Sequence, residues 1–313
     1  MGNKIATREA YGKVLAELGM NNEKIVVLDA DLSKSTKTAD FKKVCPERFV
    51  NMGIAEGNMM TVAAGMSTCD KIPFVSTFAI FATGRAYEQI RNSICYPKLN
   101  VKVCATHAGI TVGEDGASHQ SVEDISLMRG IPNMTVICPA DAIETEKAIK
   151  AVAEYNGPCY VRLGRSGVSV INDFEGYDFK IGKAVKYREG KDATIIATGI
   201  MVDAALEAYN MLAEDGIKVR VLNIHTIKPI DKEAIVSAAR ETGVIVTAEE
   251  HSIIGGLGSA VCEVTSENHP VPVIRVGIKD TFGESGKPEE LIKAYGLTAE
   301  DIVRAVKKGL SLK

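Results

Sequence analysis

The sequence contains no apolar run that approaches the roughly 20 residues a bilayer-spanning helix needs. Its N-terminus, MGNKIATREAYGKVLAELGM, lacks the apolar core of a signal peptide and is typical of a polar start to an amphipathic helix. Lys and Arg form no basic stripe, and the formal net charge is −3. These absences argue against a membrane or a nucleic acid as the main partner.

The seven cysteines are odd in number and form no C-x-x-C pair. A disulfide framework or a structural zinc site is therefore not expected, and a reducing cytoplasm is the predicted location. We find no short-period repeat and no low-complexity tract. With 313 residues, of which 46% are hydrophobic and 25% charged, the chain is long enough for two packed domains of ordinary size.

Short apolar strands alternate with helical stretches along most of the chain, a pattern that predicts βαβ units and parallel sheets. In the first half we expect strands at Ile25–Leu28, Pro73–Ser76, Val101–Ala105, Thr135–Cys138 and Cys159–Arg162, and helices at Arg8–Leu18, Glu56–Met66, Arg85–Ser93 and Ala142–Glu154. In the second half we expect strands at Thr194–Thr198, Val219–Asn223, Val244–Thr247 and Val273–Val276, and helices at Val202–Asp215, Lys232–Glu241, Gly258–Glu267 and within Pro288–Leu310. The predicted fold is two successive parallel-sheet α/β domains, 1–168 and 192–313. The intervening segment 169–191, rich in Asp, Gly and Lys, is expected to be a linker with a short strand or two.

The densest polar cluster follows the strand Val101–Ala105 and runs from Thr106 to Gln120, with the sequence THAGITVGEDGASHQ. In parallel α/β sheets ligands bind at this end of a strand. Histidine exchanges protons near neutral pH, a carboxylate can orient it, and glycine lets the backbone approach a ligand closely. A single histidine here would suit an ordinary solvated loop, but two of the chain's five histidines favour a functional loop.

Two further segments have both a structural and a functional interpretation. Glu56 ends the run Gly53-Ile54-Ala55-Glu56 and falls in the first turn of a helix, where a carboxylate also simply complements the helix dipole. Phe78 and Phe81 follow a strand three residues apart, and such a pair is more often core packing than a ligand platform. Composition alone favours the structural interpretation of each.

Taken together, the three segments resemble the transketolase family of thiamine-diphosphate enzymes, over essentially the whole chain. The most specific part is T-H-x-x-x-x-x-G-E-D-G-x-x-H-Q, which contains His107, Asp115 and His119. The G-I-A-E and T-F-x-x-F segments are shared more widely among thiamine enzymes. The resemblance implies a pyrimidine-binding domain followed by a transketolase C-terminal domain.

The resemblance implies that this chain binds the pyrimidine end of thiamine diphosphate. Glu56 matches the glutamate that hydrogen-bonds N1′ of the aminopyrimidine and so favours the imino tautomer, whose nitrogen removes the thiazolium C2 proton. A carboxyl that shares a proton works best away from water, where its pKa rises, so burial must outweigh the helix N-terminus. Phe78 and Phe81 match the aromatic pocket for the pyrimidine face, and Asp31 matches an aspartate near the cofactor and the dimer contact. At Gly84 the family often has a third aromatic residue.

The resemblance also implies a sugar-binding wall. His107, Asp115 and His119 match residues that contact the sugar's hydroxyls and carbonyl, and the two histidines join Glu56 as the candidate catalytic residues. The matches to the family's sugar-phosphate clamp are Arg8, Ser35 and Arg165. The forked donors of arginine suit phosphate oxygens.

A motif for the cofactor's diphosphate and its metal is missing. The family uses G-D-G with a downstream Asn, and here the near match Gly113-Glu114-Asp115-Gly116 is already assigned and has no such Asn. No metal site is therefore expected on this chain, and Mg²⁺ or Ca²⁺ is expected on a partner. Because the chain begins with its own Met at a helix, we expect the C-terminal subunit of a split enzyme. A self-dimer flanked by two N-terminal transketolase subunits would give a heterotetramer.

Two motifs of the second domain are expected to be structural or to lie at an interface. Gly255-Gly256-Leu257-Gly258 opens a helix and could bind an anion through backbone N–H groups, but it matches neither G-x-G-x-x-G nor a P-loop. Glu249-Glu250-His251 is similar to a family segment and is interpreted as scaffold or interface. His225 and His269 lie in no constellation and are interpreted as structural.

The expected activity is transfer of a two-carbon ketol unit from a ketose phosphate to an aldose phosphate, in the pentose phosphate pathway. The alternatives are 1-deoxyxylulose-5-phosphate synthase, whose R-A-Y-E-Q-like run occurs at 85–89, and the β subunit of a 2-oxo-acid dehydrogenase. Both usually lack the paired histidines of the G-E-D-G-x-x-H-Q stretch. A transketolase for an unusual sugar and a non-catalytic scaffold or regulatory subunit also stay open.

Overall fold

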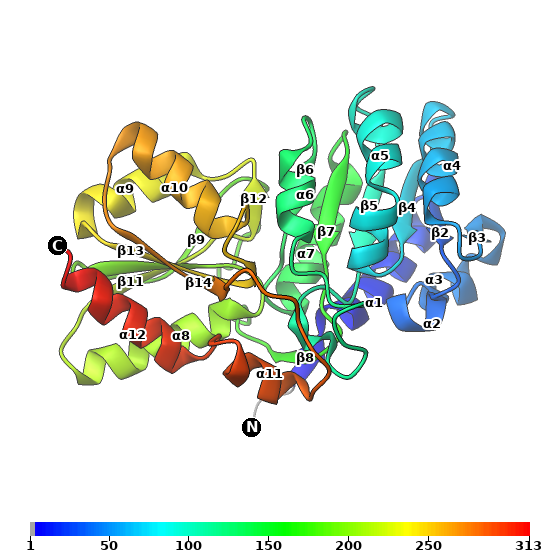
Figure 1. Cartoon of the computed structure of the whole chain (residues 1–313). Coiled ribbons are helices and arrows are strands. Elements are labelled where there is room, and N and C mark those ends of the chain that lie inside the picture. The colour runs from blue at the N-terminus through cyan, green and yellow to red at the C-terminus, as the bar shows by residue number, and fades with distance from the viewer. Residues whose placement is uncertain (1–3) are drawn as a thin grey trace.

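The structure, a computed structural model, describes residues 4–313, and it has two α/β domains side by side, each built on its own sheet (Figure 1). The sequence correctly predicted this fold class. Residues 1–3 of the expected first domain lie outside the described residues.

The first domain is built on a seven-stranded sheet with the order β12-β6-β7-β5-β4-β2-β3. Its strands are β2 Ile25–Asp29, β3 Phe49–Asn51, β4 Ile72–Ser76, β5 Lys102–Ala105, β6 Thr135–Ile137, β7 Cys159–Arg162 and β12 Thr226–Lys228. All neighbours are parallel except β12, which comes from the second half of the chain and pairs antiparallel with β6. Every residue of β2, β5, β6 and β7 is buried, as expected for parallel strands covered on both faces.

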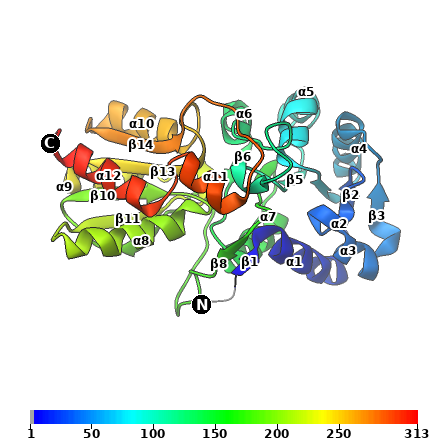
Figure 2. The same cartoon turned by 60° about the horizontal axis from the view of Figure 1, so that its bottom comes forward.

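Helices cover both faces of this sheet (Figure 2). One face carries α1 Thr7–Asn21, α3 Ala39–Val44 and α7 Ala142–Glu154, and the other carries α4 Glu56–Thr68, α5 Tyr87–Gln89 and α6 Asp124–Gly130. The shorter elements are α2 Ser33–Thr36, the 3₁₀ turns η1 Pro46–Arg48 and η4 Ile110–Val112, and a two-stranded ribbon of β1 Lys4–Ala6 and β8 Gly167–Ser169.

The second domain has a five-stranded sheet with the order β14-β13-β10-β11-β9. Its strands are β9 Val185–Arg188, β10 Ala193–Ala197, β11 Val219–Asn223, β13 Ile245–Ser252 and β14 Val273–Ile278, and only β9 is antiparallel to its neighbour. In Figure 1, α9 Lys232–Thr242 and α10 Leu257–Asn268 lie above this sheet, and α8 Met201–Glu214 and α12 Ala299–Leu310 lie below it. The helix α11 Pro288–Ala294 lies next to the first domain.

The segment expected to be one amphipathic helix at Arg85–Ser93 is wound differently. It consists of a π-helical turn η2 Phe81–Arg85, the short α5, and a second π-helical stretch η3 Ile90–Cys95. Ile90 and Cys95 are both buried although they are five residues apart, a spacing that an α-helix would not place on one face. The wider turn keeps the apolar residues in the core, and such turns often occur at functional sites.

The segment between the two sheets is anchored rather than free. The Asp141 carboxylate, at the N-cap of α7, accepts hydrogen bonds from the backbone N–H groups of Ile171 and Asn172 at 2.7 and 2.8 Å. Glu144, one turn on, accepts from Tyr177 and from the Asn223 amide of β11. The linker is thus fixed to the first domain, and its strand β9 pairs with β11 of the second.

Candidate active site

The candidate residues gather at the carboxyl ends of five neighbouring strands of the first sheet, where ligands bind in folds of this class. Asp31 and Ser35 follow β2, Glu56 follows β3, Phe78 and Phe81 follow β4, His107, Asp115 and His119 follow β5, Arg165 follows β7, and Arg8 comes from the first turn of α1. Residues from six parts of the sequence therefore share one edge of the sheet.

An aromatic surface joins the residues expected for the cofactor to those expected for the sugar. Phe78 and Phe81 stack with ring centroids 5.9 Å apart, and the His107 ring stacks on Phe78 at 3.8 Å. His119 meets the Phe81 ring edge-on at 5.5 Å. The two phenylalanines, of which Phe78 is buried and Phe81 partly exposed, therefore contact both histidines of the polar loop as well as each other.

Glu56 is the first residue of α4 and only 4% of its surface is exposed, as its expected role requires. Its Oε1 accepts a hydrogen bond of 3.0 Å from Nη1 of Arg85, whose side chain is 54% exposed. The Arg85 guanidinium also lies over the Phe81 ring, 4.2 Å from the centroid. No local sequence pattern predicts this contact, because Arg85 and Glu56 are 29 residues apart.

His107 is buried, and its Nε2 lies 3.3 Å from Nη1 of Arg8. Since arginine only donates hydrogen bonds, Nε2 is the acceptor and Nδ1 carries the proton toward the Thr106 hydroxyl at 2.9 Å. Burial, reinforced by the positive charges of Arg8 and Arg165, lowers the pKa of His107 to about 3. The ring is therefore neutral at pH 7 and acts through hydrogen bonds rather than through charge.

The loop after β2 is held by a buried carboxylate that the sequence analysis did not single out. Asp29, the last residue of β2, accepts hydrogen bonds from the backbone of Leu32 at 2.6 Å and from the hydroxyls of Thr36 and Thr38 at 2.7 and 2.8 Å. Burial raises the pKa of Asp29. The tethered loop presents the Ser35 carbonyl, to which Arg8 donates at 2.9 Å.

The three other predicted residues lie at the same edge with different contacts. Asp31 has a left-handed φ of +63° and accepts a hydrogen bond from Asn51 at 2.8 Å. Arg165 pairs with Glu114 at 3.0 Å and donates to the Val112 carbonyl. Asp115 is exposed in the turn of the same loop. Their side chains remain open to solvent or to a partner.

The glycine-rich segment 255–258 has its anion-binding groups occupied. Glu249, fully buried on β13, accepts hydrogen bonds from the N–H groups of Leu257 and Gly258 at 2.7 and 2.8 Å. Burial raises the pKa of Glu249 to about 7. The carboxylate thus caps α10, which is a structural role for this segment.

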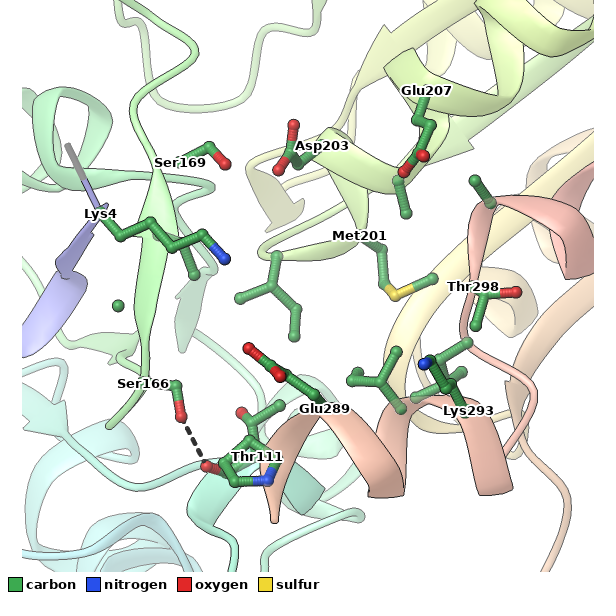
Figure 3. Close-up of a pocket in the computed structure, with 18 of the residues that line it drawn as sticks. Lys4, Thr111, Ser166, Ser169, Met201, Asp203, Glu207, Glu289, Lys293 and Thr298 are labelled. Carbon is green, nitrogen blue, oxygen red and sulfur yellow. Dashed lines mark hydrogen bonds between the residues drawn. The ribbon is translucent and has the colours of Figure 1, made fainter. Parts of the chain in front are cut away.

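Within residues 4–313, no group of three or more His, Cys, Asp or Glu side chains is placed to hold a metal ion, and no helix is long and apolar enough to cross a membrane. A cavity of about 780 Å³ lies between the two domains. Ser166, which lines it, donates a hydrogen bond of 2.9 Å to the Thr111 carbonyl (Figure 3). This cavity also receives Lys4, Asp203 and Lys293, which belong to no motif found in the sequence.

Known proteins similar to this chain are transketolases. Residues 3–169 match the transketolase pyrimidine-binding domain, and residues 182–302 match the transketolase C-terminal domain. A putative transketolase C-terminal section of Methanocaldococcus jannaschii is 53% identical over 96% of this chain and 94% of its own length. The 6-deoxy-6-sulfo-D-fructose transketolase subunit SqwH of Clostridium sp. (strain MSTE9) is 46% identical over 95% and 92%.

Among solved structures, a split gene transketolase described as an inactive beta4 tetramer superimposes with a TM-score of 0.92, with 61% identity over 99% of each chain. Both domains are covered by this match, as they are by the two sequence relatives. The chain therefore belongs to the transketolase family, and it comprises that family's pyrimidine-binding and C-terminal domains.

Proposed function

We propose that this chain is the C-terminal subunit of a two-chain transketolase, which moves a two-carbon ketol unit from a ketose phosphate to an aldose phosphate with thiamine diphosphate. The relatives described as a C-terminal section and as a subunit support the two-chain arrangement. The observation that carries the proposal is the contact of Phe78 with His107 and of Phe81 with His119, because it unites the expected cofactor and sugar residues.

The residues present fit the cofactor's aminopyrimidine. The guanidinium of Arg85 is a flat group with N–H donors, and it already stacks on Phe81 while donating to Glu56. An aminopyrimidine is also flat and offers ring nitrogens for the same carboxyl. Glu56 and Phe81 therefore offer the hydrogen-bonding carboxyl and the aromatic ring that an aminopyrimidine can use.

When bound, thiamine diphosphate supplies the carbanion-stabilising chemistry that ketol transfer needs. Glu56 would hold a proton at N1′ of the pyrimidine, and the Phe78 and Phe81 rings would exclude water from that bond. His107, being neutral, would hydrogen-bond the sugar's oxygens through Nε2 once Arg8 turns toward the phosphate. Arg165 would complete the phosphate clamp by exchanging Glu114 for phosphate oxygens.

The diphosphate and its Mg²⁺ or Ca²⁺ would be held by an N-terminal transketolase subunit. We propose a core dimer of this chain flanked by two such subunits, in keeping with the two-fold symmetry of most oligomers. A cytoplasmic location is part of the proposal and is supported by seven free cysteines, five of them buried.

Turnover by the complex with a diphosphate-binding subunit tests the function. Glu56→Gln keeps the shape of the side chain but cannot share its proton with N1′, so we expect kcat to fall by at least about 100-fold. Glu88→Gln, which changes an exposed carboxylate in the same region, is the matched control and should retain full activity. Near-normal turnover by Glu56→Gln would refute the assigned role.

A further inference from the structure

We propose that Glu250 of the second domain is a positioning residue for the loop that carries His107, Asp115 and His119. Glu250 lies near the carboxyl end of β13 and is buried against the first domain. Its Oε1 accepts a hydrogen bond of 2.8 Å from the backbone N–H of Thr111, between the two histidines.

The loop is shaped to receive this carboxylate. Gly109 has a left-handed φ of +80°, and a Cβ at this position would come within 2.2–2.4 Å of the Glu250 carboxyl atoms. Only glycine permits so close an approach. The loop backbone thus packs directly on a side chain of the other domain.

Arg162 stabilises the buried carboxylate of Glu250. Its Nη1 lies 3.7 Å from Glu250 Oε2, and its Nη2 donates to the Glu250 carbonyl at 2.9 Å. Its Nε pairs with Asp124 at 2.8 Å, and Tyr160 also donates to Asp124. Arg162 is thus held by Asp124 and in turn holds Glu250. A buried side chain in such a network has little freedom to move, so Glu250 can fix the position of the loop.

The second domain also contacts the loop near its C-terminal end. Gln120 donates to the Glu284 carbonyl at 2.9 Å and to the loop carbonyls of Ile110 and Gly113. A Cβ on Gly116 would lie 2.6 Å from the Ser285 hydroxyl. The second domain therefore holds the loop at both ends, leaving Asp115 and His119 between fixed points.

This proposal is tested first on the chain alone, by hydrogen exchange of peptides within 107–120. Glu250→Leu removes the acceptor, whereas Glu250→Gln keeps an oxygen for Thr111. We expect exchange in the loop to rise about tenfold in Glu250→Leu and to stay near wild type in Glu250→Gln. Glu249→Leu removes the adjacent buried carboxylate, which caps α10, and should leave the loop unchanged.

Kinetics supply a second readout, which rests on the proposed function. In the two-chain complex, Glu250→Leu should raise KM for a ketose phosphate about tenfold while the Kd of thiamine diphosphate stays within about twofold. Wild-type loop exchange in Glu250→Leu, an equal effect of Glu250→Gln, or faster exchange across both sheets would overturn the positioning role. An inactive wild-type complex would refute the function but leave the exchange result standing.

A separate observation concerns Arg85, and we infer that this residue competes with the cofactor's pyrimidine. The side chain uses the Glu56 carboxylate and the Phe81 face, the two groups that the proposed function gives to the pyrimidine. The Glu56 carboxyl and the Phe81 ring cannot hold Arg85 and the pyrimidine at the same time, because two flat groups between the same two side chains would overlap. Binding of the cofactor therefore requires Arg85 to swing out, and its half-exposed position leaves that path open.

Titration of the full chain with thiamine tests the competition, because thiamine has the pyrimidine but no diphosphate. Arg85→Gln should bind thiamine about tenfold more tightly than wild type, since the competent fraction of the chain rises. Arg91→Gln removes an exposed arginine that bonds only its neighbour Asn92 and should match wild type. An Arg85→Gln affinity no higher than that of wild type, including no binding by either, would overturn the inference. Turnover of Glu56→Gln tests the function independently.

Discussion

At the scale of single residues, burial decides which protonation states the protein can use. His107, His225 and His251 are all buried, and burial lowers the pKa of each, to about 3, 4 and 4. The sequence did not predict that His107 is neutral, because the burial that chiefly lowers its pKa, and the charges of Arg8 and Arg165 that add to it, come from the packing of distant segments. Arg85 and Glu250 were missed as contacts for the same reason.

His225 gives a clean test of this effect. It stacks on Phe179, and burial alone lowers its pKa to about 4, compared with about 6.5 when unfolded. As the pH falls from 7 to 5, the unfolded chain takes up a proton here that the folded chain does not. The free energy of unfolding should therefore lose about 2 kcal/mol from this group by pH 5.

His225→Gln lacks this proton uptake, so its stability relative to wild type should improve by that amount between pH 7 and pH 5. Urea unfolding at the two pH values measures the change. His269→Gln, at a half-exposed position, is the control. A gap between wild type and His225→Gln that does not change with pH would contradict the assignment.

At the scale of elements, sequence periodicity predicted most of the helices and strands that bury a continuous apolar face. The predicted Ala142–Glu154 and Cys159–Arg162 coincide with α7 and β7. The elements that the sequence did not predict are short or depend on distant partners. Helix α6 has seven residues, and β12 is a strand only because it pairs with the edge of β6. The π turns of 81–95 arise from packing in the core, which a 3.6-residue period does not encode.

Packing of α1 against α3 gives a prediction at this scale. A Cβ on Gly19 of α1 would lie 2.3 Å from the Phe41 ring of α3, so Gly19→Ala should destabilise the chain by about 1–3 kcal/mol. Gly65 lies inside α4 with nothing within 4 Å of its Cβ position. Gly65→Ala should therefore stabilise by about 0.5–1 kcal/mol.

Urea unfolding of the two variants measures both changes in the same chain. The opposite signs are the essential result, because each substitution adds one methyl group to a helix. Equal effects would mean that the close approach of Gly19 to Phe41 is absent in solution.

At the scale of the whole molecule, the candidate residues of the first domain share one edge of its sheet, and residues 4–313 contain no group of three or more His, Cys, Asp or Glu side chains placed to hold a metal. The T-H-x-x-x-x-x-G-E-D-G-x-x-H-Q motif could be recognised from the sequence because His107, Asp115 and His119 lie in one continuous loop after β5. The second domain supports this loop through contacts such as that of Glu250 with Thr111, two residues that are 139 positions apart in the sequence. No local pattern encodes those.

The proposed dependence on a diphosphate-binding partner has a measurable consequence for cofactor affinity. Charge-assisted contacts to the diphosphate contribute about 1.5–3 kcal/mol each, so losing two of them weakens binding by at least about 100-fold. Calorimetric titration with thiamine diphosphate should therefore show far weaker binding to this chain than to the two-chain complex. Equal affinity would show that the chain holds the diphosphate by itself.

The strand β12 has a consequence for dividing the protein. Residues 226–228 lie far beyond the linker in sequence, yet they cover the β6 edge of the first sheet. A fragment that stops at residue 190 would leave the backbone of β6 without this cover, and a bare edge invites pairing between chains. Dividing the polypeptide at the linker would therefore expose a strand edge that can pair with another chain. A fragment without such an edge requires a different boundary.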